Sequence, residues 1–322
     1  MKFRTEIENI SLTAKIDYRT KIFAVGSCFA QNIAQKLLNN KFKVDLCPTG
    51  ILFNPASIAS TLMAFANLQS ADSRRVVQRG ETFVSLDAHS QIAETTFDRA
   101  IEAINRANTL GHQLLTNANC VIITLGTAWV YEHNATSSVV ANCHKLPQSE
   151  FTRRPLTVAE IIDGFRPLLE GILHNKSVIF TISPVRHISD GLAENSLSKA
   201  TLRVAIAELC KLYGNVDYFP AYEIVTDDLR DYRFYADDLV HPSAQAVEYI
   251  WEHFVRSALT TTAQSLLPRV KKVVDAASHR PTNPQSEQYR EFCARYLKEA
   301  QEIADVDFSE ECAFFSQYSN KS

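Results

Sequence analysis

Short apolar runs alternate with amphipathic stretches along most of the chain. The apolar runs predict strands at residues 21–26, 43–47, 82–86, 120–125, 177–182 and 216–219. The run at 120–125 is apolar on both faces, as expected inside a parallel sheet that helices cover. The amphipathic stretches predict helices at 28–40, 57–66, 97–116, 157–174 and 190–212, and a last core helix that begins after Ser243. This alternation predicts an α/β fold with a parallel sheet between two helical layers.

Local patterns add the ends and faces of some elements. Thr157 and Glu160 form a capping-box pattern, and Ser243 can accept a hydrogen bond as an N-cap. Residues 128–142 suggest a hairpin-like excursion from the sheet. The helix at 190–212 is expected to present one side to the core through Leu197, Ala200, Val204, Ala205 and Leu209.

The character of the chain changes after residue 265. Residues 280–284 contain two prolines and predict a linker, and residues 285–305 predict a charged helix. Its apolar stripe consists of Tyr289, Phe292, Tyr296 and Leu297. We therefore expect an α/β domain over 1–265 and a helical C-terminal appendage over 266–322, which either docks on the core or makes an oligomer contact.

Composition excludes several classes of protein. The 322 residues are 46% hydrophobic and include 33 basic and 36 acidic residues, which gives a net charge of −3. A nucleic-acid partner is not expected, because such proteins usually carry a basic excess. The longest apolar runs are about five residues, far short of the roughly 18 that a membrane span needs, and residues 1–20 lack a signal-peptide core. We expect a cytoplasmic protein.

Metal and disulfide scaffolds are not expected either. The seven cysteines are odd in number and irregularly spaced, and no Cys-x-x-Cys occurs. The nine histidines show no spacing typical of metal ligands. We predict reduced thiols, no metal site and no cofactor.

In a parallel sheet the working groups lie at the carboxyl ends of the strands. Ser27 follows the first strand and precedes a helix, whose free N–H groups can hold an oxyanion. The simpler interpretation of Ser27 is a helix N-cap. Cys28 is a rival nucleophile, although we expect its side chain to point into the core.

A second candidate lies near the end of the α/β region. Asp238 and His241 are three residues apart, directly before the helix that follows Ser243. A nucleophilic serine needs a base, and the base needs a carboxylate that fixes its tautomer. Taken alone, the pair is also explained by exposed loop residues.

The combined order resembles that of the SGNH (GDSL-type) hydrolases. Residues 26–30 read Gly-Ser-Cys-Phe-Ala, and the chain is similar to the GSCFA family, a branch of the SGNH-like proteins. The resemblance extends from about Phe23 to about Phe254. It includes residues 124–131, 142–145 with Pro147, 183–187 and 235–243.

The resemblance implies a flavodoxin-like three-layer α/β/α fold and ester chemistry. Ser27 would be the nucleophile, His241 the base and Asp238 its orienting partner. In the superfamily the oxyanion is held by the serine N–H, a glycine N–H and an asparagine side chain. This chain departs from that pattern, because Gly26 stands where the superfamily has Asp and Ala128 where it has Asn.

Other residues are candidates for the missing parts of the site. Gly50 would be the second-block glycine, and Gly126 belongs to the third block. Asn54, Asn142 or Thr127 would replace the missing asparagine. His187 is a substrate contact or an alternative base, unless it only packs. The aromatic residues Phe53, Trp129 and Tyr131 line a pocket or belong to the core.

The leading hypothesis is a serine esterase, acyl hydrolase or acyl transferase that acts on an O-acylated small molecule or carbohydrate. One alternative is a non-catalytic binding module on the same fold, which the substitutions at Gly26 and Ala128 motivate. Another is a thioesterase that depends on Cys28. The pattern leaves the substrate and the oligomeric state open.

Overall fold

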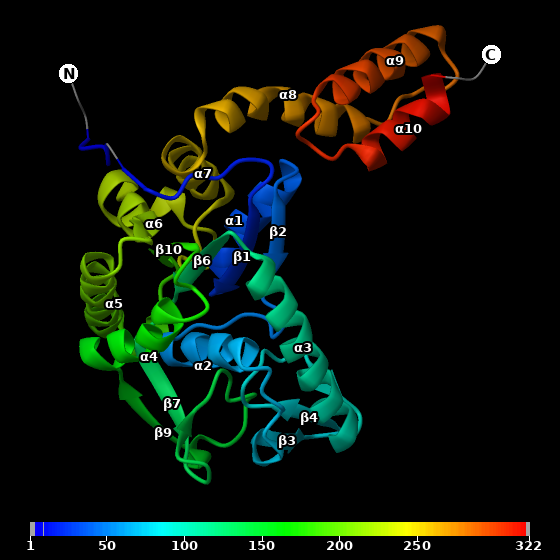
Figure 1. The fold of residues 1–322 in the computed structure, drawn as a ribbon. Coiled ribbons are helices and arrows are strands. Elements are labelled where there is room, and N and C mark those ends of the chain that lie inside the picture. The colour runs from blue at the N-terminus through cyan, green and yellow to red at the C-terminus, as the bar shows by residue number, and fades with distance from the viewer. Residues whose placement is uncertain (1–3, 9, 320–322) are drawn as a thin grey trace.

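Five parallel strands form the central sheet of the protein. The computed structural model describes residues 4–8 and 10–319 (Figure 1). The strand order is β11-β10-β6-β1-β2, and every pairing is parallel. The strands are β1 (Lys21–Gly26), β2 (Lys43–Leu46), β6 (Cys120–Leu125), β10 (Ser177–Ile182) and β11 (Val216–Phe219). The predicted parallel sheet is confirmed.

Helices cover both faces of this sheet. Ile22 and Ala24 of β1 share a core with α1 (Cys28–Asn39) and α7 (Ala244–Ala258). Phe23 and Val25 share the opposite core with four other helices. These are α2 (Pro55–Ala66), α3 (Phe97–Asn117), α4 (Val158–Glu170) and α5 (Leu192–Leu212). The alternation of β1 side chains between the two cores produces the three-layer α/β/α fold that we expected.

The predicted inner face of α5 is wrong in part. Ala205 and Leu209 are buried, but Leu197 and Val204 are 62% and 50% exposed. The helix instead buries a polar stripe at its amino-terminal half, formed by Asn195, Ser198 and Lys199. Hydrophobic periodicity misplaces this face because the buried stripe is polar.

Two small antiparallel sheets flank the central one. The first has the order β3-β4-β5 and the second the order β8-β7-β9. Their strands are β3 (Val76–Arg79), β4 (Thr82–Ser85), β5 (Ala93–Glu94), β7 (Trp129–His133), β8 (Ser138–Val139) and β9 (Phe151–Pro155). The expected hairpin over 128–142 is formed by β7 and β8. Figure 1 shows β7 and β9 next to each other, well below the central sheet.

The predicted helix caps are present. Thr157 and Glu160 form the capping box of α4, and the Ser243 hydroxyl accepts the N–H of Ala246 at the start of α7. Short helical segments complete the α/β part of the chain. They are η1 (Ser73–Arg75), η2 (Gln148–Glu150), η3 (Ile188–Asp190), α6 (Ala221–Glu223), η4 (Ile224–Leu229) and η5 (Tyr232–Phe234).

Three helices extend from the α/β body at the C-terminal end (Figure 1). They are α8 (Thr261–Ala277), α9 (Glu287–Glu302) and α10 (Ser309–Ser319). The stripe predicted on α9 packs largely against α10, since the ring of Tyr296 stacks on Phe315 and that of Tyr289 contacts Tyr318. An ion pair of 2.8 Å between Lys41 and Glu311 links α10 to the end of α1. Helix α8 runs through position 265, so the boundary that we placed there stays a prediction.

Candidate functional site

The site lies where β1 and β6, neighbours in the sheet, end side by side. Gly26 closes β1 with a φ of +134°, and a Cβ there would lie 2.1 Å from the carbonyl oxygen of Thr124 on β6. Only glycine tolerates this conformation and this approach. The N–H of Ser27 donates to the same Thr124 oxygen at 3.0 Å. Gly26 therefore allows the start of α1 to pack closely against β6.

Ser27 occupies the N-cap position of α1, but its hydroxyl caps nothing. The residue is 1% exposed, and its Oγ has no hydrogen-bond partner. Ser27 Oγ is therefore not hydrogen-bonded to His241, the base assigned to it by the family resemblance. A buried hydroxyl without a partner costs about 1–3 kcal/mol. The fold thus keeps an unpaired hydroxyl at the amino end of a helix, where the helix dipole favours negative charge.

Asp238 and His241 form the contact that their spacing predicts. Oδ2 of Asp238 lies 2.6 Å from Nδ1 of His241. Oδ1 accepts the backbone N–H groups of Val240 and His241, both at 2.9 Å. The backbone N–H of His241 is the main cause that lowers the pKa of Asp238 to about 2. Because an ionised carboxylate only accepts, Nδ1 carries the proton and Nε2 is left as a proton acceptor.

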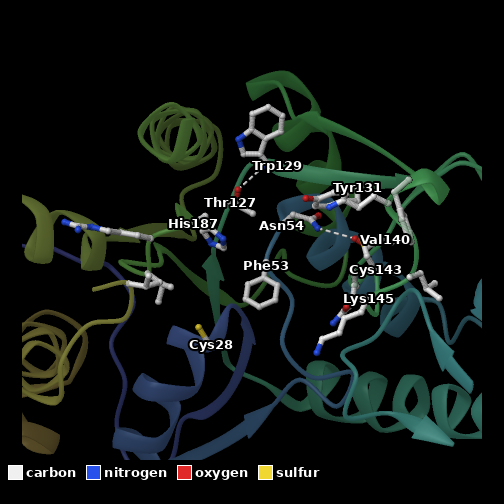
Figure 2. A pocket seen from close by; sticks show the side chains of 18 of the residues that line it. Cys28, Phe53, Asn54, Thr127, Trp129, Tyr131, Val140, Cys143, Lys145 and His187 are labelled. Carbon is white, nitrogen blue, oxygen red and sulfur yellow. Dashed lines mark hydrogen bonds between the residues drawn. The ribbon is translucent and has the colours of Figure 1, made fainter. Parts of the chain in front are cut away.

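His241 opens onto a pocket of 730 Å³. This volume suits a small organic molecule. Figure 2 shows side chains from several elements around the cavity, including Phe53, Thr127 and His187. The remaining described lining residues are Cys28, Asn54, Trp129, Tyr131, Val140, Ala141, Asn142, Cys143, Lys145, Leu146, Gln148, Phe151, Val185, Arg186 and Val240. Phe53, Trp129 and Tyr131 therefore line a pocket, which was one of their two predicted roles.

Cys28, not Ser27, forms the pocket surface at the start of α1. The half-buried side chain of Cys28 packs against the core, as expected, but it also lines the pocket (Figure 2). Cys28 is the first helical residue, so its side chain lies at the edge of the sheet, while Phe29 and Ile33 pack beneath. Burial raises the pKa of its thiol. This effect outweighs that of the backbone N–H groups of Phe29 and Cys28, which lower the pKa.

The two glycines proposed for the oxyanion hole use their N–H groups elsewhere. Gly50 donates to the carbonyl of Cys47 at 3.0 Å, and Gly126 donates to the carbonyl of Phe53 at 2.7 Å. A Cβ on Gly50 would lie 2.6 Å from His89 Cβ, and one on Gly126 would lie 2.9 Å from Phe53 O. Both positions need glycine for close packing, and in this structure neither offers a free donor.

Of the three side chains considered as the replacement donor, Asn142 is the one whose amide N–H groups are both unpaired among the described residues. Asn54 accepts the N–H of Ser57 as the cap of α2 and donates weakly to Val140 O at 3.4 Å. Thr127 bonds Ser198 Oγ at 3.1 Å and accepts the N–H of Trp129. Asn142 Oδ1 accepts the N–H of His144 at 2.7 Å, and its NH₂ group bonds to none of the described residues.

His187 brings a third strand end to the pocket. It follows β10, and its ring lies edge-on to Phe53 at 6.1 Å between centroids. Its Nε2 would lie 3.4 Å from a Cβ on Gly126, so the imidazole stands beside the end of β6. His187 therefore lines the pocket, and its role as a substrate contact or an alternative base stays a prediction.

One buried residue was missed by the sequence analysis. Lys199 of α5 is 2% exposed, and its Nζ donates to the carbonyls of Gly126 and Ser183 at 2.6 and 2.7 Å. Burial lowers its pKa to about 7. Lys199 therefore ties together the ends of β6 and β10 beneath the pocket. The one feature of the sequence that could have indicated this burial is that Lys199 shares a helix face with the polar residues Asn195 and Ser198.

Two features are absent from residues 4–8 and 10–319. No set of three or more His, Cys, Asp or Glu side chains lies close enough together to hold a metal ion. None of the helices has both the length and the apolar character that crossing a membrane requires.

The fold and the site define a class of three-layer α/β/α proteins with a pocket at the carboxyl edge of a sheet of flavodoxin-like order. Residues 21–254 match the sequence model of the GSCFA family, and residues 270–320 match the model described as GSCFA domain protein, C-terminal domain. The chain therefore belongs to the GSCFA family. No curated protein matches it.

Proposed function

We propose that this protein is an ester hydrolase or acyl transferase of the SGNH type, and that its substrate is an O-acylated small molecule or carbohydrate. The observation that carries the proposal is the Asp238–His241 pair, whose imidazole lines a pocket that reaches the start of α1. Ser27 holds its unpaired hydroxyl at that helix terminus. A base with a fixed tautomer, a hydroxyl and a cavity are the parts that acyl transfer needs.

In the proposed reaction Nε2 of His241 takes the Ser27 proton while Oγ attacks the carbonyl carbon of the ester. Asp238 stabilises the imidazolium, and the Asn142 amide is suitably free to donate to the oxyanion. Collapse of the intermediate breaks the ester C–O bond, and the departing alcohol takes the proton from His241. Water or an acceptor hydroxyl then attacks the acyl-serine by the same route and restores Ser27.

The buried position of Ser27 sets one requirement for this reaction. The hydroxyl must turn from its buried position toward the pocket before it can attack. Since Oγ has no hydrogen-bond partner, this rotation breaks no hydrogen bond. The rotation takes the side chain from one staggered conformation to another.

Cys28 carries the second candidate function, a thiol-dependent thioesterase. The observation that favours it is accessibility, because the Cys28 side chain lines the pocket whereas Ser27 does not. Burial raises the pKa of the thiol, which disfavours the nucleophilic thiolate at neutral pH. We therefore rank the serine mechanism first.

Four proteins distinguish these functions: the wild type, Ser27→Ala, Cys28→Ala and the control Cys210→Ala on α5. Each is tested for hydrolysis of p-nitrophenyl acetate and an acetyl thioester, and for labelling by a fluorophosphonate probe. We expect Ser27→Ala to lose ester turnover by at least about 10³-fold, together with the label. A loss confined to Cys28→Ala assigns the thiol mechanism. A folded wild type without turnover or label rejects both and leaves a binding module.

A further inference from the structure

The described residues that line the pocket include cationic side chains but no carboxylate. The two cations are Lys145 and Arg186. Overall composition does not explain this, because the chain has a net charge of −3. The Arg186 guanidinium stacks over the rings of Tyr235 at 3.9 Å and Tyr232 at 4.9 Å. Lys145 makes no ion pair or hydrogen bond with any described residue, so its charge is available to a ligand.

The backbone beneath Lys145 is held in an unfavourable conformation. His144 and Lys145 have φ values of +51° and +60°, a region that L-residues other than glycine seldom adopt. Asn142 accepts the N–H of His144, and the buried His144 ring donates through Nε2 to Ser85 O at 2.7 Å. Burial lowers the pKa of His144, so this anchor is neutral. Such strain persists where the surroundings enforce it, typically at ligand sites.

The rest of the pocket suits the organic part of a ligand. Phe53, Trp129, Tyr131 and Phe151 contribute aromatic surface. In the view of Figure 2, Lys145 lies across the cavity from Cys28, with Phe53 between them. A ligand whose carbonyl reaches the start of α1 therefore meets the Phe53 ring next and a cation at its far end.

We propose that the pocket selects esters that carry a carboxylate on the acyl or the alcohol part, and that Lys145 is the specificity-determining residue that pairs with this anion. The inference rests on the proposed ester chemistry for the reaction, but the charge preference also applies to binding alone. A carboxylate at contact distance from an exposed ammonium is worth about fivefold in affinity.

The kinetic test compares anionic with neutral esters. The acyl-side pair is mono-4-nitrophenyl glutarate against 4-nitrophenyl butyrate, and the alcohol-side pair is 4-acetoxybenzoate against its methyl ester. For each pair, the readout is kcat/KM of the anionic ester divided by kcat/KM of the neutral ester. Dividing this ratio for a variant by the same ratio for wild type cancels the intrinsic reactivity of the two esters. We expect Lys145→Met to lower the ratio of one pair about fivefold, and Lys145→Arg to keep it. The control Lys298→Met, on exposed α9, should leave both ratios unchanged.

Binding of non-hydrolysable amide analogues of both pairs, measured by calorimetry, separates this inference from the proposed reaction. If wild type turns over no ester, the reaction fails, but tighter binding of an anionic amide that Lys145→Met loses and Lys145→Arg keeps still supports the role of Lys145. That preference should weaken in 1 M NaCl. Equal binding of anionic and neutral amides by wild type, or equal ratios in wild type and Lys145→Met, overturns the proposal.

Discussion

Asp238 holds His241 at two points, through a 2.6 Å contact between Oδ2 and Nδ1 and through a 2.9 Å hydrogen bond from the backbone N–H to Oδ1. The carboxylate thereby fixes both the ring and the turn that carries it. The pair is half exposed, with the His241 side chain 51% accessible. A contact of this kind contributes little to stability in so open a position. Its value lies in presenting one ring nitrogen to the pocket.

Replacing Asp238 with Asn should reduce catalysis far more than stability. The amide can place an N–H against Nδ1 and so favour the wrong tautomer of His241. We expect kcat/KM for p-nitrophenyl acetate to fall about 10²–10⁴-fold at pH 7.5. The neighbouring exposed Asp237 offers a matched control, and Asp237→Asn should retain wild-type turnover. Similar rates for the two variants would remove the Asp238–His241 pair from the mechanism.

Asn142 can be tested with a substitution that keeps its structural hydrogen bond. In Asn142→Asp the side chain still accepts the N–H of His144, but it no longer has an N–H to donate. If this donor holds the oxyanion, turnover should fall about 10²–10³-fold while the thermal midpoint changes little. Asn134→Asp, at an exposed turn, controls for the added charge. Full activity of Asn142→Asp would transfer the oxyanion role to another group.

Gly126 should prove necessary for the packing of the site. A Cβ at this position would lie 2.9 Å from the backbone oxygen of Phe53 and 3.4 Å from Nε2 of His187. We expect Gly126→Ala to lower the free energy of unfolding by about 1–3 kcal/mol in urea. Gly214→Ala is the control, because no atom lies within 4 Å of its added Cβ. Equal stability of the two variants would show that the Phe53 segment moves aside without cost.

The features that the sequence predicts well are those that depend on local chemistry. The strand at 120–125 is apolar on both faces because it lies in the middle of the sheet. Thr157 and Ser243 cap helices because their side chains reach backbone groups only three residues away. The contact between Asp238 and His241 likewise closes within one turn of chain. All the residues that make such contacts lie within a few positions of one another in the sequence.

The features that were missed depend on partners far away in the sequence. Gly126 and Asn54 were plausible oxyanion donors until the fold paired them with Phe53 and Val140. Cys28 and Ser27 are neighbours, and only the packing of α1 against β6 decides which of them reaches the pocket. The inner face of α5 was misjudged because it contains Lys199, and a buried lysine is rare. The carbonyls that accept its hydrogen bonds follow two different strands, β6 and β10.

Lys199 makes stability depend on pH in a predictable direction. Burial lowers its pKa to about 7 in the folded protein, whereas a lysine in the unfolded chain titrates near 10.4. Between these values the unfolded state binds more protons, so stability should rise as the pH increases. Below pH 7 both states are protonated and the full cost of burying the charge remains. A neutral amine still has two N–H donors, enough for the carbonyls of Gly126 and Ser183.

The measurement is the free energy of unfolding in urea at several values between pH 7 and pH 10. Wild type should gain stability relative to Lys199→Met with a slope of up to about 1.4 kcal/mol per pH unit. Lys199→Met removes the titrating group, so the difference reports the titration of Lys199 together with its electrostatic interaction with the Cys28 thiol. Lys211→Met, at an exposed position on the same helix, should run parallel to wild type. Parallel curves for wild type and Lys199→Met would instead mean that the buried amine keeps its proton throughout this range. The ammonium would then be a fixed positive charge beneath the pocket.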